Sequence, residues 1–381
     1  MPVVTTFVNE AGKRVYDFGQ NFSGIVKLKV KGRKGETIRL RPAELLKADG
    51  TPNQTASGEP FYLQYTIGAD SVEEVWQPQF TYYGFRYAQL EDAVDKSDTI
   101  DEALPVILDI EGLHTTLNAS PSGTFSCSKP MFNDIYRLID WAVRSNMASV
   151  LTDCPHREKL GWQEQNYLMQ SALLYAYDLS SLFPKIMNDL ESSQWSNGCV
   201  PTIAPEYVRF VNGFEDTPEW GSALVICPWY IYEWYGDDSL LRTHYPAMKR
   251  YIDYLGERAD NNIVAYGLGD WYDIAPGKPG RSKLTSNGVT ATATYYFDTL
   301  ILSKAARFMG LDDDAARYDS LAREIKRSYN EAFFNEAGYY DRNSQTANAI
   351  SLHLGLVPEG RENDVLNSLV EDIRSRDNGL T

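Results

Sequence analysis

The chain has 381 residues, of which 43% are hydrophobic and 23% are charged, so it is a folded chain of two or three domains and not a disordered one. Its 36 basic and 52 acidic residues give a formal net charge of −16, which argues against a nucleic-acid partner or an anionic membrane, because both require a basic surface. It contains no apolar run of the roughly 18 residues that a membrane helix needs, and its first residues do not resemble a signal peptide. Cytoplasmic and exported locations both stay open, as does a homo-oligomeric state.

The cysteine and histidine content argues against a metal centre. The four cysteines include no CxxC pair and there are only four histidines, so we expect no metal and no cofactor. Aromatic residues are abundant at 13%. Flat aromatic rings stack on the C–H faces of sugars, but they also fill ordinary protein cores. The composition therefore favours a large core, with a sugar-binding cleft as the alternative.

Residues 1–118 are predicted to form an antiparallel β-sandwich. Residues 24–31 alternate apolar and basic side chains, the period of a strand with one wet face. Frequent glycine turns separate further short runs of the same kind, which are typical of a sandwich. These runs cover residues 37–41, 61–67, 72–76 and 85–90.

Residues 119–381 are predicted to be all-α, because the hydrophobic period lengthens near residue 126. A cap at Ser128–Lys129 precedes Pro130 in the first turn of the first helix. Consecutive helices of similar length favour a toroid of helical hairpins, in which the loops at one end form the functional face. A solenoid of helical pairs is disfavoured, because the sequence shows no repeat at a fixed period. About nine helices are expected, an odd number for hairpins, which indicates that the chain could be a fragment. The later ones are expected at roughly 162–178, 181–195, 219–235, 239–257, 290–309, 313–333, 346–355 and 361–375.

The densest group of reactive side chains lies in residues 152–165. A proline and a glycine disfavour regular helix there, so residues 153–161 are predicted to form a loop. Glu158 lies between two cations and close to Trp162 in the sequence. An apolar wall would raise the pKa of this carboxyl, as a general acid requires, whereas the cations would lower it. A salt-bridge network that stiffens a surface loop is an equally compatible interpretation.

Several segments together resemble one enzyme family. Residues 153–162 read DCPHREKLGW and resemble the D-C-P-x-R-E-x-L-G-W signature of family 78 glycoside hydrolases, the α-L-rhamnosidases. Residues 16–24 (YDFGQNFSG) resemble the opening of that family's β-sandwich, and residues 80–87 (FTYYGFRY) resemble its closing strand. Residues 269–273 (GDWYD) resemble a G-D-W-L-D segment of its catalytic barrel. The segments occur in the same order along almost the whole chain.

This resemblance implies a β-sandwich followed by an (α/α)6 barrel, and hydrolysis of terminal α-L-rhamnosides with inversion, so the partner is a rhamnose-containing carbohydrate. In such a reaction an acid protonates the leaving oxygen while a carboxylate roughly 6.5–9.5 Å away activates water. On the motif, Glu158 falls on the general acid. Asp153 and Arg157 fall on positions that bind sugar hydroxyls or organise the site. Trp162 falls on a wall whose indole would suit the methyl group of the deoxysugar.

The chain departs from the family pattern in two places. Where the family commonly has T-G-D after the signature, residues 163–165 read QEQ, so Gln165 takes the aspartate position. An amide can hydrogen-bond a sugar but carries no negative charge, and we expect altered sugar contacts. The late G-A-T-T-x-x-E-like segment that carries the family's general base does not occur before Thr381. The resemblance therefore implies a base beyond this chain, and within it an incomplete barrel that we expect to be inactive on its own.

The other candidates are weaker. Asp270 and the adjacent Trp271 could contact the sugar, although a simple turn explains them as well. Asp216 and Glu219 are acids near a predicted helix start and are given no catalytic role, and Trp220 fits a cleft or a core.

Two rival functions belong to other classes. One is a different helical-toroid enzyme, such as a glycosidase or lyase for uronic-acid sugars, which the acidic surplus of the chain disfavours. The other is a carbohydrate-binding or scaffold relative that has kept the fold without turnover.

Overall fold

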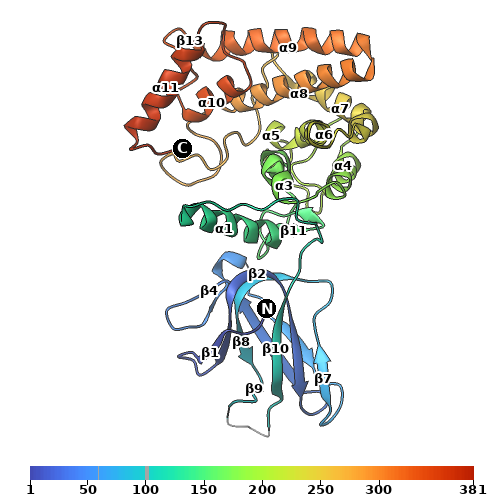
Figure 1. Cartoon of the computed structure of the whole chain (residues 1–381), viewed down its shortest axis with the longest axis vertical. Coiled ribbons are helices and arrows are strands. Elements are labelled where there is room, and N and C mark those ends of the chain that lie inside the picture. The colour runs from blue at the N-terminus through green and yellow to red at the C-terminus, as the bar shows by residue number, and fades with distance from the viewer. Residues whose placement is uncertain (59, 99–102) are drawn as a thin grey trace. The chain divides into compact units, whose positions relative to one another are not determined.

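A computed structural model describes residues 1–58, 60–98 and 103–381, and in it the chain divides into two compact units (Figure 1). The first unit comprises Met1–Ala119 and Thr124–Leu160, and the second comprises Ser120–Gly123 and Gly161–Thr381. Each unit is described by itself below. The domain boundary after residue 118 stays a prediction, because the first unit also takes in the first helix and the loop that follows it.

The first unit is built around one long strand, β2 (Arg14–Lys31). Its first half pairs antiparallel with β8 (Tyr83–Glu91), and its second half pairs antiparallel with β10 (Val106–His114). The eight-stranded sheet has the order β6-β3-β8-β2-β10-β9, and β1 and β7 also pair with β2. The remaining strands are β1 (Thr5–Val8), β3 (Thr37–Ala43), β4 (Leu45–Leu46), β5 (Pro52–Asn53), β6 (Leu63–Thr66), β7 (Glu73–Trp76) and β9 (Val94–Asp95).

The core of this unit follows the period-two pattern of the sequence. Along β2, Val26, Leu28 and Val30 are buried, whereas the lysines between them are exposed. Phe22 contacts the ring of Phe85 on β8 at a centroid distance of 4.6 Å. Side chains from β2, β3, β8 and β10 share one hydrophobic cluster, so the sheet encloses its own core. The predicted β-domain is confirmed.

The first helix, α1 (Pro130–Asn146), belongs to the first unit and packs against the sandwich core through Trp141. Pro130 occupies the first turn, as predicted. The cap residue is Lys129, and no side chain caps the helix, because a lysine side chain has no hydrogen-bond acceptor. The expected Ser128 cap is therefore wrong. The apolar side chains of Met131 and Leu138 on this helix are exposed.

The second unit contains helices joined by irregular loops, and their positions follow the sequence prediction closely except at 162–178 and at 219–235, where Ser222 separates two helices. The predicted helix at 162–178 is two shorter helices that break at Met169. As a result the buried positions include Asn166 and Leu173, and Leu168 is exposed. The helices are α2 (Glu164–Leu168), α3 (Gln170–Ala176), α4 (Leu182–Ser193), α5 (Pro218–Gly221), α6 (Ala223–Tyr235), α7 (Ser239–Arg258), α8 (Asn287–Met309), α9 (Asp312–Phe333), α10 (Gln345–His353) and α11 (Glu362–Ser375).

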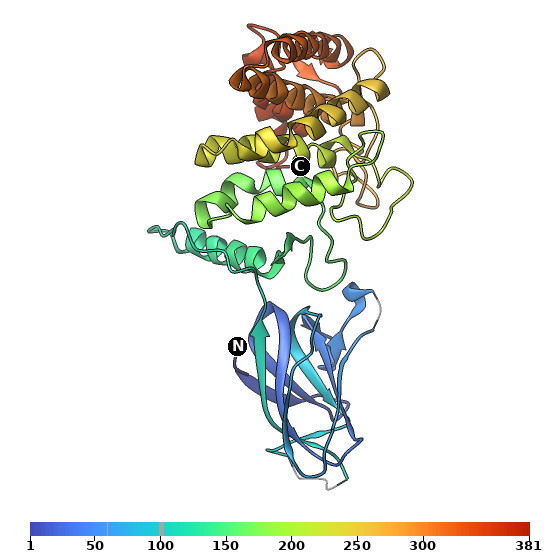
Figure 2. The same cartoon turned by 90° about the vertical axis from the view of Figure 1, so that its right-hand side faces the viewer.

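Inner and outer helices alternate in this unit (Figures 1 and 2). Helix α8 is buried on all sides from Gly288 to about Ser303 and contacts α5, α6, α7, α9 and α10, and its buried face includes several threonines as well as apolar side chains. Helices α7, α9 and α11 instead each expose a polar face. Gly236 and Gly310 end α6 and α8 in the left-handed conformation, which lets the chain reverse into the next helix. This layering confirms the predicted helical toroid as the fold class.

Three short antiparallel pairs complete the described part of the chain. They join β4 to β5, β11 (Met147–Ala148) to β12 (Val150–Leu151), and β13 (Phe334–Asn335) to β14 (Tyr339–Tyr340). Across the three described ranges, every helix is too short or too polar to cross a membrane.

The sandwich core makes a prediction at Gly112. A Cβ atom there would lie 2.6 Å from Cζ of Phe22 and 3.2 Å from the ring of Phe18. Gly112→Ala should therefore lower the free energy of unfolding by about 1–3 kcal/mol, because an overpacked core must shift. Urea unfolding measures the change. Gly68→Ala is the control, since its added methyl group meets only the end of the Glu74 side chain at 3.2 Å. Equal stability of the two variants would contradict the prediction.

Candidate active site

The segment that carries the signature motif is a closed loop in the first unit. It follows the β11–β12 hairpin, and Asp153 and Leu160 fasten its two ends together. The backbone N–H of Asp153 donates to the carbonyl of Leu160 at 3.1 Å, and the N–H of Leu160 donates to Oδ1 of Asp153 at 3.0 Å. Between these residues the chain makes turns without regular helix, so the predicted loop is confirmed.

The inside of the loop is held by Cys154. Its thiol donates to Oδ2 of Asp153 at 3.1 Å, and its sulfur accepts the backbone N–H of Glu158 at 3.4 Å. Burial raises the pKa of Asp153, and the nearby charge of Glu158 raises it further, although hydrogen bonds from Cys154 and Leu160 oppose the shift. The carboxyl groups of Asp153 and Glu158 are thus close enough for the charge of Glu158 to affect the pKa of Asp153.

Glu158 is bound by the cation that precedes it. Nη2 of Arg157 donates to Oε1 of Glu158 at 2.5 Å, and the two side chains are 53% and 32% exposed, respectively. The structure therefore brings together Asp153, Arg157 and Glu158, an arrangement that fits both the motif and a salt-bridge network of the loop, so their roles stay predictions. A carboxyl that is partly exposed but held by a charged partner is accessible to a ligand and has a defined direction.

The second unit positions the other residues of the motif. Trp162 forms an isolated antiparallel bridge with Ile203, and its indole stacks on the ring of Phe210 at 5.1 Å and 23°. Phe210 in turn neighbours Phe214 at 6.3 Å, and Phe214 meets Trp271 edge-on at 5.4 Å. The predicted sugar-contacting residues Trp162 and Trp271 thus belong to one row of four aromatic rings, which we call the aromatic row. Such a row offers flat apolar surfaces suited to sugar C–H faces.

The two polar candidates of this unit are partly buried. Asp270 accepts a hydrogen bond from the hydroxyl of Thr346 at 2.6 Å, and burial raises its pKa, with the charge of Asp273 contributing. Asp273 itself accepts the backbone N–H groups of two residues across its loop, so it holds the turn. Gln165 lies in α2 with a half-buried side chain.

Glu219, which is given no catalytic role on the sequence alone, is a buried carboxyl at the start of α5 with a raised pKa. It is 8% exposed, and neither of its carboxyl oxygens has a hydrogen-bond partner of normal geometry among the described residues. Burial raises its pKa to about 7, the charges of Asp270 and Asp216 add to the shift, and the hydroxyl of Thr290 opposes it. A carboxyl that titrates near neutrality can both donate and accept a proton, which is a common property of functional groups.

A sequence signal for Glu219 exists in hindsight. It stands between a proline and a tryptophan at the start of the very apolar helix pair α5 and α6, where an acid is unusual. Asp216, three residues earlier, has a structural role instead. It pairs with Arg258 and accepts the hydroxyl of Tyr254 at 2.5 Å. Trp220 is 4% exposed and belongs to the core.

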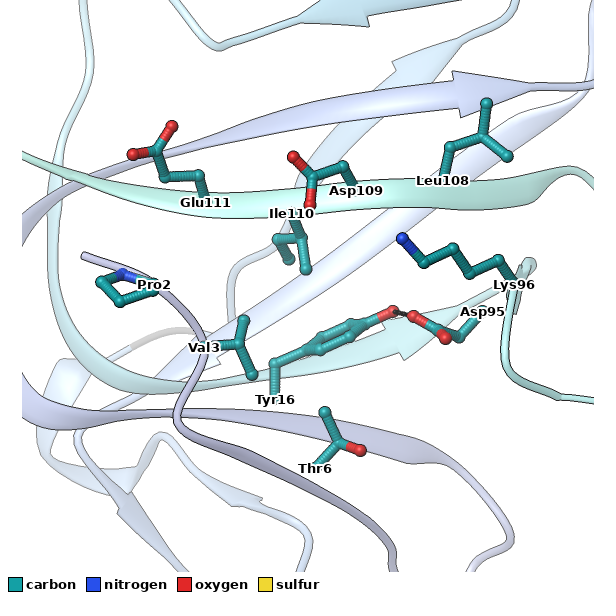
Figure 3. A pocket seen from close by; sticks show the side chains of 10 residues that line it. All are labelled: Pro2, Val3, Thr6, Tyr16, Asp95, Lys96, Leu108, Asp109, Ile110 and Glu111. Carbon is teal, nitrogen blue, oxygen red and sulfur yellow. Dashed lines mark hydrogen bonds between the residues drawn. The ribbon is translucent and has the colours of Figure 1, made fainter.

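The sandwich carries a separate open hollow of about 530 Å³ (Figure 3). Figure 3 shows the hydroxyl of Tyr16 directed at Asp95, a hydrogen bond of 2.7 Å, with Asp109 and Glu111 on the neighbouring strand. Because Asp109 and Glu111 are exposed and Asp95 is already engaged, we assign this hollow no catalytic role. Within the described part of the chain, no three His, Cys, Asp or Glu side chains are grouped to hold a metal ion.

Comparison with known families places both halves of the chain. The bacterial alpha-L-rhamnosidase 6 hairpin glycosidase domain matches residues 120–381, and the bacterial alpha-L-rhamnosidase concanavalin-like domain matches residues 8–108. A curated α-L-rhamnosidase of Formosa agariphila is 31% identical over 96% of this chain and 40% of its own length.

Solved structures agree with these matches. The α-L-rhamnosidase from Dictyoglumus thermophilum is 34% identical, with a TM-score of 0.89 over 99% of this chain and 42% of that one. The Streptomyces avermitilis α-L-rhamnosidase complexed with L-rhamnose is 29% identical, with a TM-score of 0.85 over 99% of this chain and 35% of that one. The chain thus spans less than half the length of these relatives.

The buried Glu219 predicts a pH-dependent stability. Its pKa is about 4.5 in the unfolded chain and about 7 in the folded chain, so the protonated form stabilises the fold at low pH. That contribution should be complete below about pH 4.5 and lost progressively up to about pH 7, a change of about 3 kcal/mol. Glu219→Gln cannot ionise and should gain stability relative to the wild type over this range.

Urea unfolding at a series of pH values measures the difference. Glu331→Gln is the control, because the side chain of Glu331 is 71% exposed and stays in water in both states. A difference between Glu219→Gln and the wild type that stays constant from pH 4.5 to 7 would show that Glu219 is not desolvated as described.

Proposed function

Because this chain belongs to the bacterial α-L-rhamnosidase family, we propose that the protein is an inverting glycoside hydrolase that releases terminal α-L-rhamnose. The substrates are glycans or glycosides that carry this sugar. The proposal concerns the complete protein, since the chain spans 40% of the length of a curated relative.

The observation that carries the proposal is the geometry around Glu158. Its carboxyl lies at the acid position of the family motif, in a loop whose ends are fastened by Asp153 and Leu160. A hydrogen bond of 2.5 Å from Nη2 of Arg157 to Oε1 of Glu158 orients the carboxyl, and the side chain of Glu158 is 32% exposed. A proton donor must be held in place and still reach the leaving oxygen, and this arrangement meets both requirements.

The sugar-binding roles follow from chemistry and from the match to a relative. Trp162 and Trp271 belong to the aromatic row, whose flat faces suit the C–H groups and the methyl group of rhamnose. Asp153, Arg157, Gln165 and Asp270 supply donors and acceptors for sugar hydroxyls. Rhamnose as the bound sugar is supported by the Streptomyces avermitilis structure, which is described as a complex with L-rhamnose.

Inversion requires a second carboxylate that activates water on the face opposite to Glu158. We assign none of the carboxyls in this chain to that role. Glu219 is nearly buried, and its neighbours Asp270 and Asp216 are engaged by Thr346 and by Tyr254 and Arg258, respectively.

The acid role of Glu158 predicts a dependence on the leaving group. Glu158→Gln should lower kcat on methyl α-L-rhamnoside by roughly 10²–10⁴-fold, because an alkoxide cannot leave without a proton. The loss on p-nitrophenyl α-L-rhamnoside should be much smaller, since nitrophenolate is a stable anion. Steady-state kinetics on the complete protein give both values, and thermal unfolding checks that the variant is folded.

Two outcomes would contradict this assignment. Near-normal turnover of methyl α-L-rhamnoside by Glu158→Gln would remove Glu158 as the acid. Binding of rhamnose by the folded wild type without release from either substrate would favour the carbohydrate-binding relative over the enzyme.

The stereochemical outcome is a separate prediction. An inverting enzyme should release β-L-rhamnose first from an α-L-rhamnoside, because water attacks from the face opposite to the leaving group. Proton NMR during the first minutes of hydrolysis, before mutarotation mixes the anomers, resolves the two anomeric signals. Initial release of the α anomer would indicate a retaining mechanism.

A further inference from the structure

The sandwich touches the loop of Glu158 directly, through backbone atoms. At the start of β8, the N–H of Gly84 donates to the carbonyl of Pro155 at 2.9 Å. The two segments are so close that a Cβ atom on Gly84 would lie 2.8 Å from Cγ of Pro155. All of these residues belong to the first compact unit, and the loop therefore rests on the sandwich itself.

A second contact reinforces the first. Nδ1 of His156 lies 3.5 Å from Oε2 of Glu44, which follows strand β3. The amide of Asn21 donates to Oε1 of the same glutamate at 3.0 Å. Asn21 lies in β2, within the segment that resembles the family's opening strand. The sequence motifs at 16–24 and 153–162 therefore meet in space through Glu44.

The third contact is a cation held between aromatic rings. The ammonium group of Lys159 lies 4.0 Å from the ring centroid of Tyr83 and 4.7 Å from that of Tyr82, and it donates to the carbonyl of Tyr82. Tyr83 is itself stacked on Phe61 at 4.0 Å and 13°, so this ring is fixed from its other side. A partly desolvated cation over two rings is a stronger contact than an exposed one.

Lys159 follows Glu158 directly and has a φ of 55°, a left-handed conformation that a lysine rarely adopts. Such strain persists only where the surroundings enforce it, and the contacts with Tyr82 and Tyr83 supply that constraint. The side chains of the two neighbours thus have different partners, Arg157 for Glu158 and the tyrosines for Lys159.

We propose that the segment Tyr82–Gly84 of the sandwich is a positioning element of the active site. It holds Lys159 and Pro155, and through them it fixes the direction in which the Glu158 carboxyl presents its proton. Lys159 is a positioning residue in this scheme, because its contacts are with the sandwich. The proposal rests on the proposed function, in which Glu158 is the general acid.

The test compares two substrates with different leaving groups, methyl and p-nitrophenyl α-L-rhamnoside, in the complete protein. Lys159→Met keeps the length of the side chain but removes its charge and its donors. It should lower kcat on the methyl glycoside by about 10- to 100-fold, because a small displacement of a proton donor is costly. The loss on the nitrophenyl glycoside and the change in KM should both be much smaller.

Lys159→Arg should restore most of the activity, because a guanidinium keeps the charge, the donors and the contact with the rings. The matched control is Lys304→Met, since Lys304 lies 5.5 Å from the ring centroid of Trp229 in the second unit, outside the proposed machinery. This control should leave turnover of both substrates unchanged.

The double variant with Glu158→Gln separates the two proposals. If Lys159 acts through the acid, Lys159→Met should cause no further leaving-group effect once Glu158 is gone. Equal losses on both substrates that follow the folded fraction would show that Lys159 only stabilises the loop, which overturns the inference. If Glu158→Gln alone shows no leaving-group effect, the proposed acid is wrong. If Glu158→Gln behaves as expected and Lys159→Met does not, only the inference fails.

Discussion

The reciprocal hydrogen bonds between Asp153 and Leu160 are the constraint on which the site depends. They close an eight-residue stretch that contains a proline, a left-handed lysine and no regular secondary structure. Without this closure, the sulfur of Cys154 would have no fixed backbone to accept from, and Glu158 would follow a mobile chain. Burial and the nearby charge of Glu158 also raise the pKa of the Asp153 carboxyl. One aspartate therefore closes the loop and also lies in it as a partly buried carboxyl beside Glu158.

Much of the fold could be predicted from the sequence, because burial has a simple period in both units. The alternation of apolar and basic residues along β2 and the helical period at 290–309 are local signals, and the structure confirms the strand and the helix α8. The helix predicted from residue 162 begins only at Glu164, and this could not be predicted in the same way. Trp162 pairs instead with Ile203 in an antiparallel bridge, a contact between segments about 40 residues apart. A tertiary contact of this kind takes precedence over local helix propensity.

The proximity of candidate residues could be predicted where they share one motif, and it could not where separate loops come together. Asp153, Arg157 and Glu158 lie within six residues and are close in the structure, whereas their roles stay predictions. Phe210 and Phe214, which link the two predicted tryptophans, come from a loop without periodicity. The raised pKa of Glu219 depends on burial by distant elements, which no short segment encodes.

The contact between Gly84 and Pro155 has a consequence for how this protein can be recombined. Glycine is required there because any side chain would collide with the proline ring and with Glu44. The sandwich and the loop are thus complementary in shape, and neither can be replaced alone by the corresponding segment of a homologue. A chimaera that takes its sandwich from one homologue and its helices from another would need to inherit residues 44, 82–84 and 155–159 from the same parent.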